Sequence, residues 1–143
     1  MASQPRITEV TWEAPHSTLV LRRSAPGVVM LVITGTDVGE HGTGPFEELA
    51  SDVRTGPLTL FVDARNSRGV TIDVSSEWCQ WLSRNRRALS EIHMLTGSPF
   101  VHVTATFVRN FAELTDLMRI YTQPAEFERA LSAALRDAAA STK

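Results

Sequence analysis

The residues best suited to regulatory chemistry are two adjacent serines, Ser75 and Ser76, which follow Asp73 in the segment that opens the longest predicted helix. A helix N-terminus presents backbone N–H groups without intrahelical partners, and these stabilise a phosphate group on a nearby serine. In the simpler alternative, Asp73, Ser75 or Ser76 is only the N-cap, whose side chain contributes about 1 kcal/mol to helix stability. Ser75 and Ser76 are therefore the candidate phosphorylation sites.

Two tryptophans, Trp78 and Trp81, lie three residues apart on the same predicted helix. Residues at this spacing are about one helical turn apart, so the two indoles lie on one face. Three roles remain open: a place in the hydrophobic core, the lining of a pocket for an apolar ligand, or a partner interface, where Trp is enriched. Trp78 and Trp81 are candidate ligand- or partner-binding residues.

Charged residues near this helix form a second group of candidates. Asp63 ends a short predicted strand, where α/β proteins place their ligands, and Asp73 could form a carboxylate pair with it. Arg65 and Arg68 follow in a predicted loop. Together with the helix arginines they form either an anion-binding surface or an ordinary solvated face. The helix arginines are Arg84, Arg86 and Arg87.

No motif predicts catalysis, a cofactor or a metal ion. The four histidines form no His-x-His or His-x-x-x-His pair. The chain also lacks a Gly-x-Ser-x-Gly elbow and a Gly-x-x-x-x-Gly-Lys-Ser/Thr phosphate loop. Asp37, Glu40 and His41 lie in a flexible glycine-rich loop, which is a poor preformed metal site. We therefore expect no catalytic residues, no cofactor and no bound metal.

Composition narrows the class of protein. The chain has 143 residues, 43% hydrophobic and 21% charged, which is enough to form the core of one domain. Its net charge of −2 argues against a nucleic-acid partner, and the single cysteine, Cys79, excludes an internal disulfide. Residues 28–33, the longest apolar-rich stretch, are far fewer than the ~20 that cross a bilayer. Since no signal peptide is apparent either, we expect a cytoplasmic protein without an integral membrane segment.

Hydrophobic periodicity and turn residues divide the chain into alternating strands and helices. Residues 24–27 carry turn chemistry and predict a β-hairpin, while β-branched residues predict a strand at 100–106. The predicted strands are 17–23, 28–34, 58–63, 100–106 and 119–121, while 7–14 is either a further N-terminal strand or an extended arm and 64–69 is a polar loop. The predicted helices are 44–55, 73–95 (ended by Gly97), 111–118, and a last helix from a cap at Thr122 to about 138.

This order, β-β-α-β-α-β-α-β-α, predicts an α/β fold. We expect a single domain over residues 1–143, with a mixed sheet of about five strands, mostly parallel at its centre, flanked by about four helices. Residues 1–6 and 138–143 are expected to be flexible ends.

Three segments resemble the STAS fold, and in particular the SpoIIAA-like family, which is similar in fold to the CRAL-TRIO lipid carriers. They are the hairpin with residues 28–34, the strand 58–63 leading to the helix start at 73–76, and the closing strand and helix at 120–135. In anti-anti-sigma members, an Asp-Ser pair opens the second helix, and phosphorylation of that serine switches binding to an anti-sigma kinase. Here one extra residue separates Asp73 from Ser75, and Glu77 and Trp78 replace the usual glycine.

The resemblance implies a non-enzymatic, cytoplasmic interaction module of regulatory type, switched by serine phosphorylation. Its partner would be another protein, such as an anti-sigma-type kinase, or a second copy of the chain. The alternative is a small carrier that binds an apolar or lipid-like ligand in a CRAL-TRIO-like pocket. A carrier requires a cavity of roughly 300 Å³ or more, whereas an interaction module requires an exposed patch near the helix that begins at Asp73.

Overall fold

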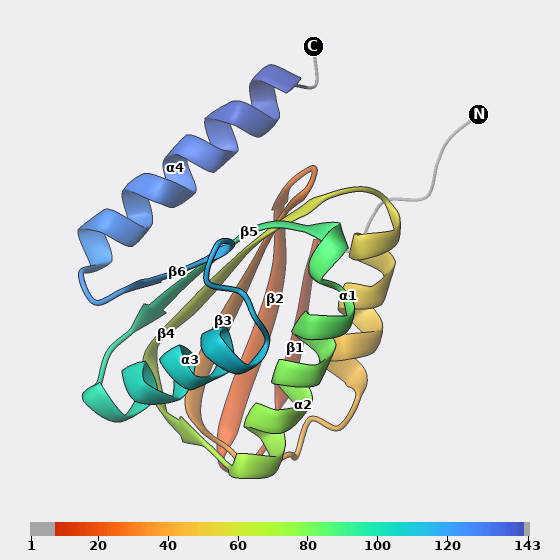
Figure 1. The fold of residues 1–143 in the computed structure, drawn as a ribbon. Helices are drawn as coiled ribbons and strands as arrows, with labels where there is room; N and C mark the ends of the chain where they lie inside the picture. The colour runs from red at the N-terminus through yellow and green to blue at the C-terminus, as the bar shows by residue number, and fades with distance from the viewer. Residues whose placement is uncertain (1–7, 142–143) are drawn as a thin grey trace.

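A six-stranded mixed sheet forms the centre of the protein in a computed structural model that describes residues 8–141. Its strands lie side by side in the order of the sequence (Figure 1). The first three pair antiparallel and the last four pair parallel, sharing the third. The strands are β1 (Glu9–Glu13), β2 (Ser17–Ala25), β3 (Val28–Asp37), β4 (Leu58–Val70), β5 (Leu89–Thr96) and β6 (Met118–Tyr121). The predicted α/β class is confirmed, with six strands in place of about five.

Three helices cover one face of the sheet and the fourth covers the other (Figure 1). Each of the first three connects two neighbouring parallel strands, and these strands advance across the sheet in one direction. Because such crossovers are right-handed, all three helices fall on the same face. The helices are α1 (Gly44–Arg54), α2 (Ile72–Arg84), α3 (Pro99–Phe111) and α4 (Pro124–Ser141).

The core is divided into two layers by the sheet. Side chains alternate along β4, so that Leu60 and Val62 belong to the cluster beneath α1, α2 and α3, while Phe61 belongs to the cluster beneath α4. Phe61 packs edge-on against Phe127 of α4, and both rings are fully buried. Strands apolar on both faces are expected where helices cover both sides of a parallel sheet.

A buried ion pair links β2 to α1. The Arg23 guanidinium donates to both carboxylate oxygens of Asp52, at 2.8 and 2.9 Å, and also to Glu48 at 2.9 Å. The side chains of Arg23 and Asp52 are only 9% and 5% exposed. The hydrogen bond to Asp52 raises the pKa of Arg23, so the guanidinium stays charged.

The predicted strand at 100–106 is wrong, because these residues lie within α3. Ser98 is the N-cap of this helix, and its hydroxyl accepts a hydrogen bond from the Val101 N–H at 3.2 Å. Pro99 occupies the first turn, where its missing N–H has no cost. The cap, together with the burial of one face of the helix, outweighs the β preference of the valines and threonines.

The predicted helix 73–95 is also wrong beyond Arg84. Asn85 ends α2 by directing its backbone and side-chain N–H groups to the Trp81 carbonyl, a short 3-10 turn follows at Arg86–Ala88, and then β5 begins. The predicted helix 111–118 does not form, since α3 ends at Phe111 and β6 starts at Met118. Gly97 therefore follows a strand, and a Cβ at this position would overlap the Arg65 carbonyl oxygen.

The boundaries of other elements also differ from the predicted ones. The predicted loop 64–69 continues β4 as far as Val70, with irregular pairing to β3. The last helix begins at Pro124 with Gln123, not Thr122, accepting its first backbone hydrogen bonds. It extends to Ser141, past the position where flexibility was expected. Of the ends expected to be flexible, 1–6 and 138–143, residues 1–6 and 142–143 lie outside the described residues.

Candidate functional site

The main candidate site is a stripe of exposed apolar side chains along α3, which we call the α3 stripe. It consists of Phe100, Val103, Phe107 and Phe111, which are 64%, 67%, 50% and 68% exposed. Large apolar side chains with this exposure are unusual when they occur together, because a contiguous apolar patch on a soluble domain commonly marks a binding surface. Phe107 and Phe111 stack on each other at a centroid distance of 4.3 Å.

The α3 stripe is separate from the face of α3 that packs on the sheet. The packed face consists of Val101, Ala105 and Val108 in the helix and Ala112 at its end, all buried in the core. At 100° per residue, the two faces are centred roughly 120° apart around the helix. The stripe therefore adds nothing to the core of a single chain.

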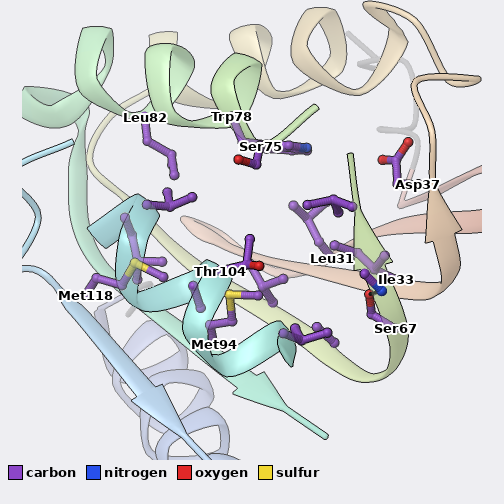
Figure 2. A pocket seen from close by; sticks show the side chains of 18 of the residues that line it. Leu31, Ile33, Asp37, Ser67, Ser75, Trp78, Leu82, Met94, Thr104 and Met118 are labelled. Atoms are coloured by element: carbon purple, nitrogen blue, oxygen red, sulfur yellow. Dashed lines mark hydrogen bonds between the residues drawn. The ribbon is translucent and has the colours of Figure 1, made fainter. Parts of the chain in front are cut away.

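A cavity lies beneath α3, between α2, α3 and the sheet (Figure 2). Its volume is about 90 Å³ and its walls are almost entirely apolar. Trp78, Ser75 and Leu82 project into it from α2, Asp37 and Ser67 lie toward one end, and Met118 lies toward the other (Figure 2). This volume is below the roughly 300 Å³ expected for a drug-sized ligand.

The polar groups at the end of the cavity are engaged locally. Asp37 is buried, and its carboxylate accepts a hydrogen bond from the Gly39 N–H at 2.9 Å. The Ser67 hydroxyl accepts the Gly69 N–H at 3.3 Å. Because both side chains bond to the backbone N–H two residues further along, the cavity is an apolar space with a polar rim.

The structure corrects the predicted helix cap. Thr71 is the N-cap of α2, and its hydroxyl accepts the Val74 N–H at 3.3 Å, so Asp73, Ser75 and Ser76 are not caps. The backbone N–H of Ser75 donates to the Thr71 carbonyl and is already within the helix. Ser75 is half-buried beside the cavity, whereas Ser76 and Asp73 are exposed.

Trp81 belongs to the core, and Trp78 is half-buried against it. The two indoles meet edge-to-face at 6.4 Å, and Phe46 of α1 lies 4.6 Å from Trp78. This aromatic cluster joins α1 to α2. Trp78 also lines the cavity, so this side chain both packs against the core and forms part of the cavity wall.

Asp63 and Arg65 lie on the opposite face of the sheet from α2. Arg65 donates to Asp63 at 3.0 and 3.2 Å and to Glu128 of α4 at 3.4 Å. The hydrogen bond to Asp63 raises the pKa of Arg65. The suggested pairing of Asp63 with Asp73 is therefore wrong, because Asp73 lies on α2 across the sheet. Arg68 is exposed near the end of β4.

A chain of polar side chains that runs from the buried Tyr121 and His93 to the exposed Glu91 was not predicted from the sequence. His93 bonds to the Tyr121 hydroxyl at 2.8 Å and to Glu91 at 2.7 Å, and its ring stacks on Phe61. Burial raises the pKa of Tyr121 above its usual value of 10.0. The chain of hydrogen bonds joins β5 to β6 and satisfies the polar atoms that α4 covers.

Within residues 8–141, no three His, Cys, Asp or Glu side chains are grouped so that they could hold a metal ion. None of the helices described is both long and apolar enough to cross a membrane.

Comparison with solved structures identifies the fold. The chain is similar to an uncharacterised protein of the DUF3478 family from Shewanella loihica PV-4, whose crystal structure has a SpoIIAA-like fold. The alignment covers 92% of this chain and 98% of that protein, with a TM-score of 0.58 and 10% sequence identity. The chain has a SpoIIAA-like fold. No family model matches the sequence, and no curated protein matches it.

The SpoIIAA-like fold brings together only some of the predicted site residues. Ser75 and Trp78 lie at the cavity, but Asp63 and Arg65 are on the other face of the sheet. The sequence does not predict the α3 stripe, because the β-branched residues of its segment favour a strand. Two signals could have revealed it: the helix-start pair Ser98-Pro99, and the spacing of three and four residues among the stripe residues.

Proposed function

We propose that this protein is a non-enzymatic interaction module of the STAS type, which binds protein partners through the α3 stripe. The observation that carries this proposal is the exposure of three phenylalanines and one valine on a helix that already has a separate packed face. Aromatic residues are enriched in the centres of protein interfaces, where charged residues are depleted. The SpoIIAA-like fold is compatible with such a role.

The alternative, a carrier for an apolar ligand, is less well supported by the cavity. A volume of about 90 Å³ is smaller than the space in which a lysozyme core variant holds benzene, about 150 Å³. A lipid chain would require α2 and α3 to separate. The interaction module needs no such rearrangement, because the α3 stripe is already exposed.

We further propose that the protein is cytoplasmic and that phosphorylation regulates its binding. Of the two candidate serines, Ser76 is exposed and therefore open to a kinase, whereas Ser75 is half-buried at the cavity. An anti-sigma-type kinase is the partner that the family resemblance suggests. Mass spectrometry of the protein purified from its own host should find phosphate on Ser76, and an unmodified peptide under all growth conditions would remove this part of the proposal.

Photo-cross-linking tests whether the α3 stripe binds protein. Phe107 is replaced with photoreactive p-benzoyl-phenylalanine, and the full chain is irradiated in its host cell. We expect a discrete cross-linked adduct that disappears when Val103→Asp is added on the same helix face. The control places the same photoreactive residue at Ser132, which is exposed on α4 across the sheet.

Comparing the adducts at positions 107 and 132 decides whether the α3 stripe binds protein. An adduct at position 107 that is sensitive to Val103→Asp supports the proposal. Equal labelling at positions 107 and 132, or labelling that Val103→Asp does not change, would show that the stripe is not a protein interface. Circular dichroism of each variant establishes that the chain remains folded.

A further inference from the structure

We propose that the partner of the α3 stripe is a second copy of this chain, bound through an antiparallel pair of α3 helices about a two-fold axis. This inference rests on the proposed function and names its partner. It follows from the order of the stripe residues, their exposed area and the charge of the helix.

The order of the stripe residues is nearly the same in both directions along α3. The residues occur at 100, 103, 107 and 111, as Phe, Val, Phe and Phe. Reversing the helix about a point near Ala105 places Phe100 opposite Phe111 of the second copy and Val103 opposite Phe107. A two-fold interface must be self-complementary in this way, because each patch meets its own copy.

The exposed area suits a dimer of ordinary size. From their exposed fractions, the three phenylalanines present roughly 350 Å² per chain, taking about 150–250 Å² for each aromatic side chain. A standard interface buries about 800 Å² per partner and is about 65% apolar in homodimers. The stripe supplies the aromatic centre, and the neighbouring surface of α2 and α3 supplies the rim.

The charge on α3 also favours a second copy. Arg109 is the helix's single Asp, Glu, Lys or Arg residue, so two antiparallel copies meet with little charge repulsion. A membrane surface fits less well, because α3 carries one arginine and no lysine in place of a basic cluster, and the exposed acid Glu113 follows the helix directly. Aromatic residues without such a cluster favour a protein contact over anionic lipid.

Sedimentation equilibrium of the full chain over a range of concentrations tests the dimer. We expect a reversible dimer whose dissociation constant rises roughly 10- to 100-fold in Val103→Asp and in Phe107→Asp, as burial of one such side chain contributes. Ser132→Asp adds the same charge to an exposed helix position on the other face of the sheet and should leave the dimer unchanged.

Cysteine pairing tests the antiparallel arrangement. In a Cys79→Ser background, Phe100→Cys and Phe111→Cys are prepared as separate proteins. An equal mixture should form a disulfide between the two variants under mild oxidation. Each variant alone should not, because two copies of position 100 would lie roughly 16 Å apart along the helices, given 1.5 Å per residue. Disulfides formed by the single variants alone would overturn the antiparallel arrangement.

Other outcomes separate this inference from the proposed function. A wild-type chain that is monomeric at every concentration, yet cross-links through position 107 to a different protein, would overturn the dimer and leave the interaction module intact. Absence of both the dimer and the adduct would overturn both proposals. Binding of a monomeric chain to phosphatidylcholine vesicles, abolished by Phe107→Asp, would assign the stripe to a membrane and overturn the dimer.

Discussion

The ring of Phe107 stacks on the ring of Phe111 with 27° between their planes, although half or more of each side chain is exposed. The two residues are four apart, so they meet on one side of α3. Each ring reduces the water-exposed area of the other, but neither enters the core. The pair therefore leaves an aromatic surface exposed on α3.

Phe111 and Phe127 provide a matched test of which aromatic residues hold the fold. Phe127→Ala should lower the free energy of unfolding by about 3–5 kcal/mol, because a fully buried ring leaves a cavity. Phe111→Ala should lower it by no more than about 1.5 kcal/mol, the value of an aromatic pair. Urea denaturation at a concentration where the chain is monomeric measures both. Equal losses would show that Phe111 packs in the core.

The buried pair of Arg23 and Asp52 should be sensitive to the loss of one partner. We expect Asp52→Ala to cost about 3–5 kcal/mol, since it removes the buried carboxylate that Arg23 binds through two hydrogen bonds and leaves the guanidinium charge buried. Arg22→Ala is the control, because its ion pair with Glu9 is about half exposed at both ends and should contribute less than about 1 kcal/mol. Chemical denaturation compares the two, and similar small losses would contradict the buried pair.

Tyr121 should make the stability fall at alkaline pH. Its pKa is raised in the folded chain above the 10.0 of the unfolded chain, so the unfolded state releases the phenolic proton first. The unfolded state then binds fewer protons, and the free energy of unfolding falls as the pH rises above 10. Since Tyr121 is the single tyrosine in the chain, the ultraviolet absorbance of tyrosinate reports its titration directly.

The control for this titration is the chain unfolded in guanidinium chloride, where Tyr121 should ionise near its usual pKa. Tyr121→Phe should remove this part of the stability loss above pH 10. If the folded and unfolded chains titrate at the same pH, the phenol is not buried as described.

Thr71 should stabilise α2, while Ser75 and Ser76 should not act as caps. Thr71→Ala removes the acceptor for the Val74 N–H and should cost about 1 kcal/mol. Ser76→Ala affects an exposed side chain beyond the cap and should change stability by less than about 0.5 kcal/mol. Thermal unfolding followed by circular dichroism measures both. A larger loss for Ser76→Ala would restore the serine as the cap.

The hairpin and the α/β class could be predicted because turn residues and alternating segments are local signals. The boundaries of α2 and β5 could not. Leu89, Ile92 and Leu95 have helical spacing in the sequence, yet Ile92 and Leu95 lie on opposite faces of β5. A strand covered on both sides is apolar throughout, so it lacks the period of two that distinguishes a strand from a helix.

The candidate site was predictable only in part for a related reason. Ser75 and Trp78 were expected near a ligand or partner surface, and both line the cavity. Asp63 and Arg65 were expected with them, but their segment continues β4, and strand alternation directs both toward α4. The α3 stripe forms only because Val103 is helical. The cap at Ser98 favours this helix more strongly than the β preference of valine opposes it.

The strands lie in the sheet in the same order as in the sequence, and this has a consequence for synthesis on the ribosome. Each new strand pairs with the one made just before it, so no strand waits for a distant partner that has not yet been translated. The growing sheet can add β4, β5 and β6 in turn as α1, α2 and α3 emerge between them. Once β6 has paired with β5, the parallel edge of the sheet is this four-residue strand, which is too short to recruit much extraneous chain.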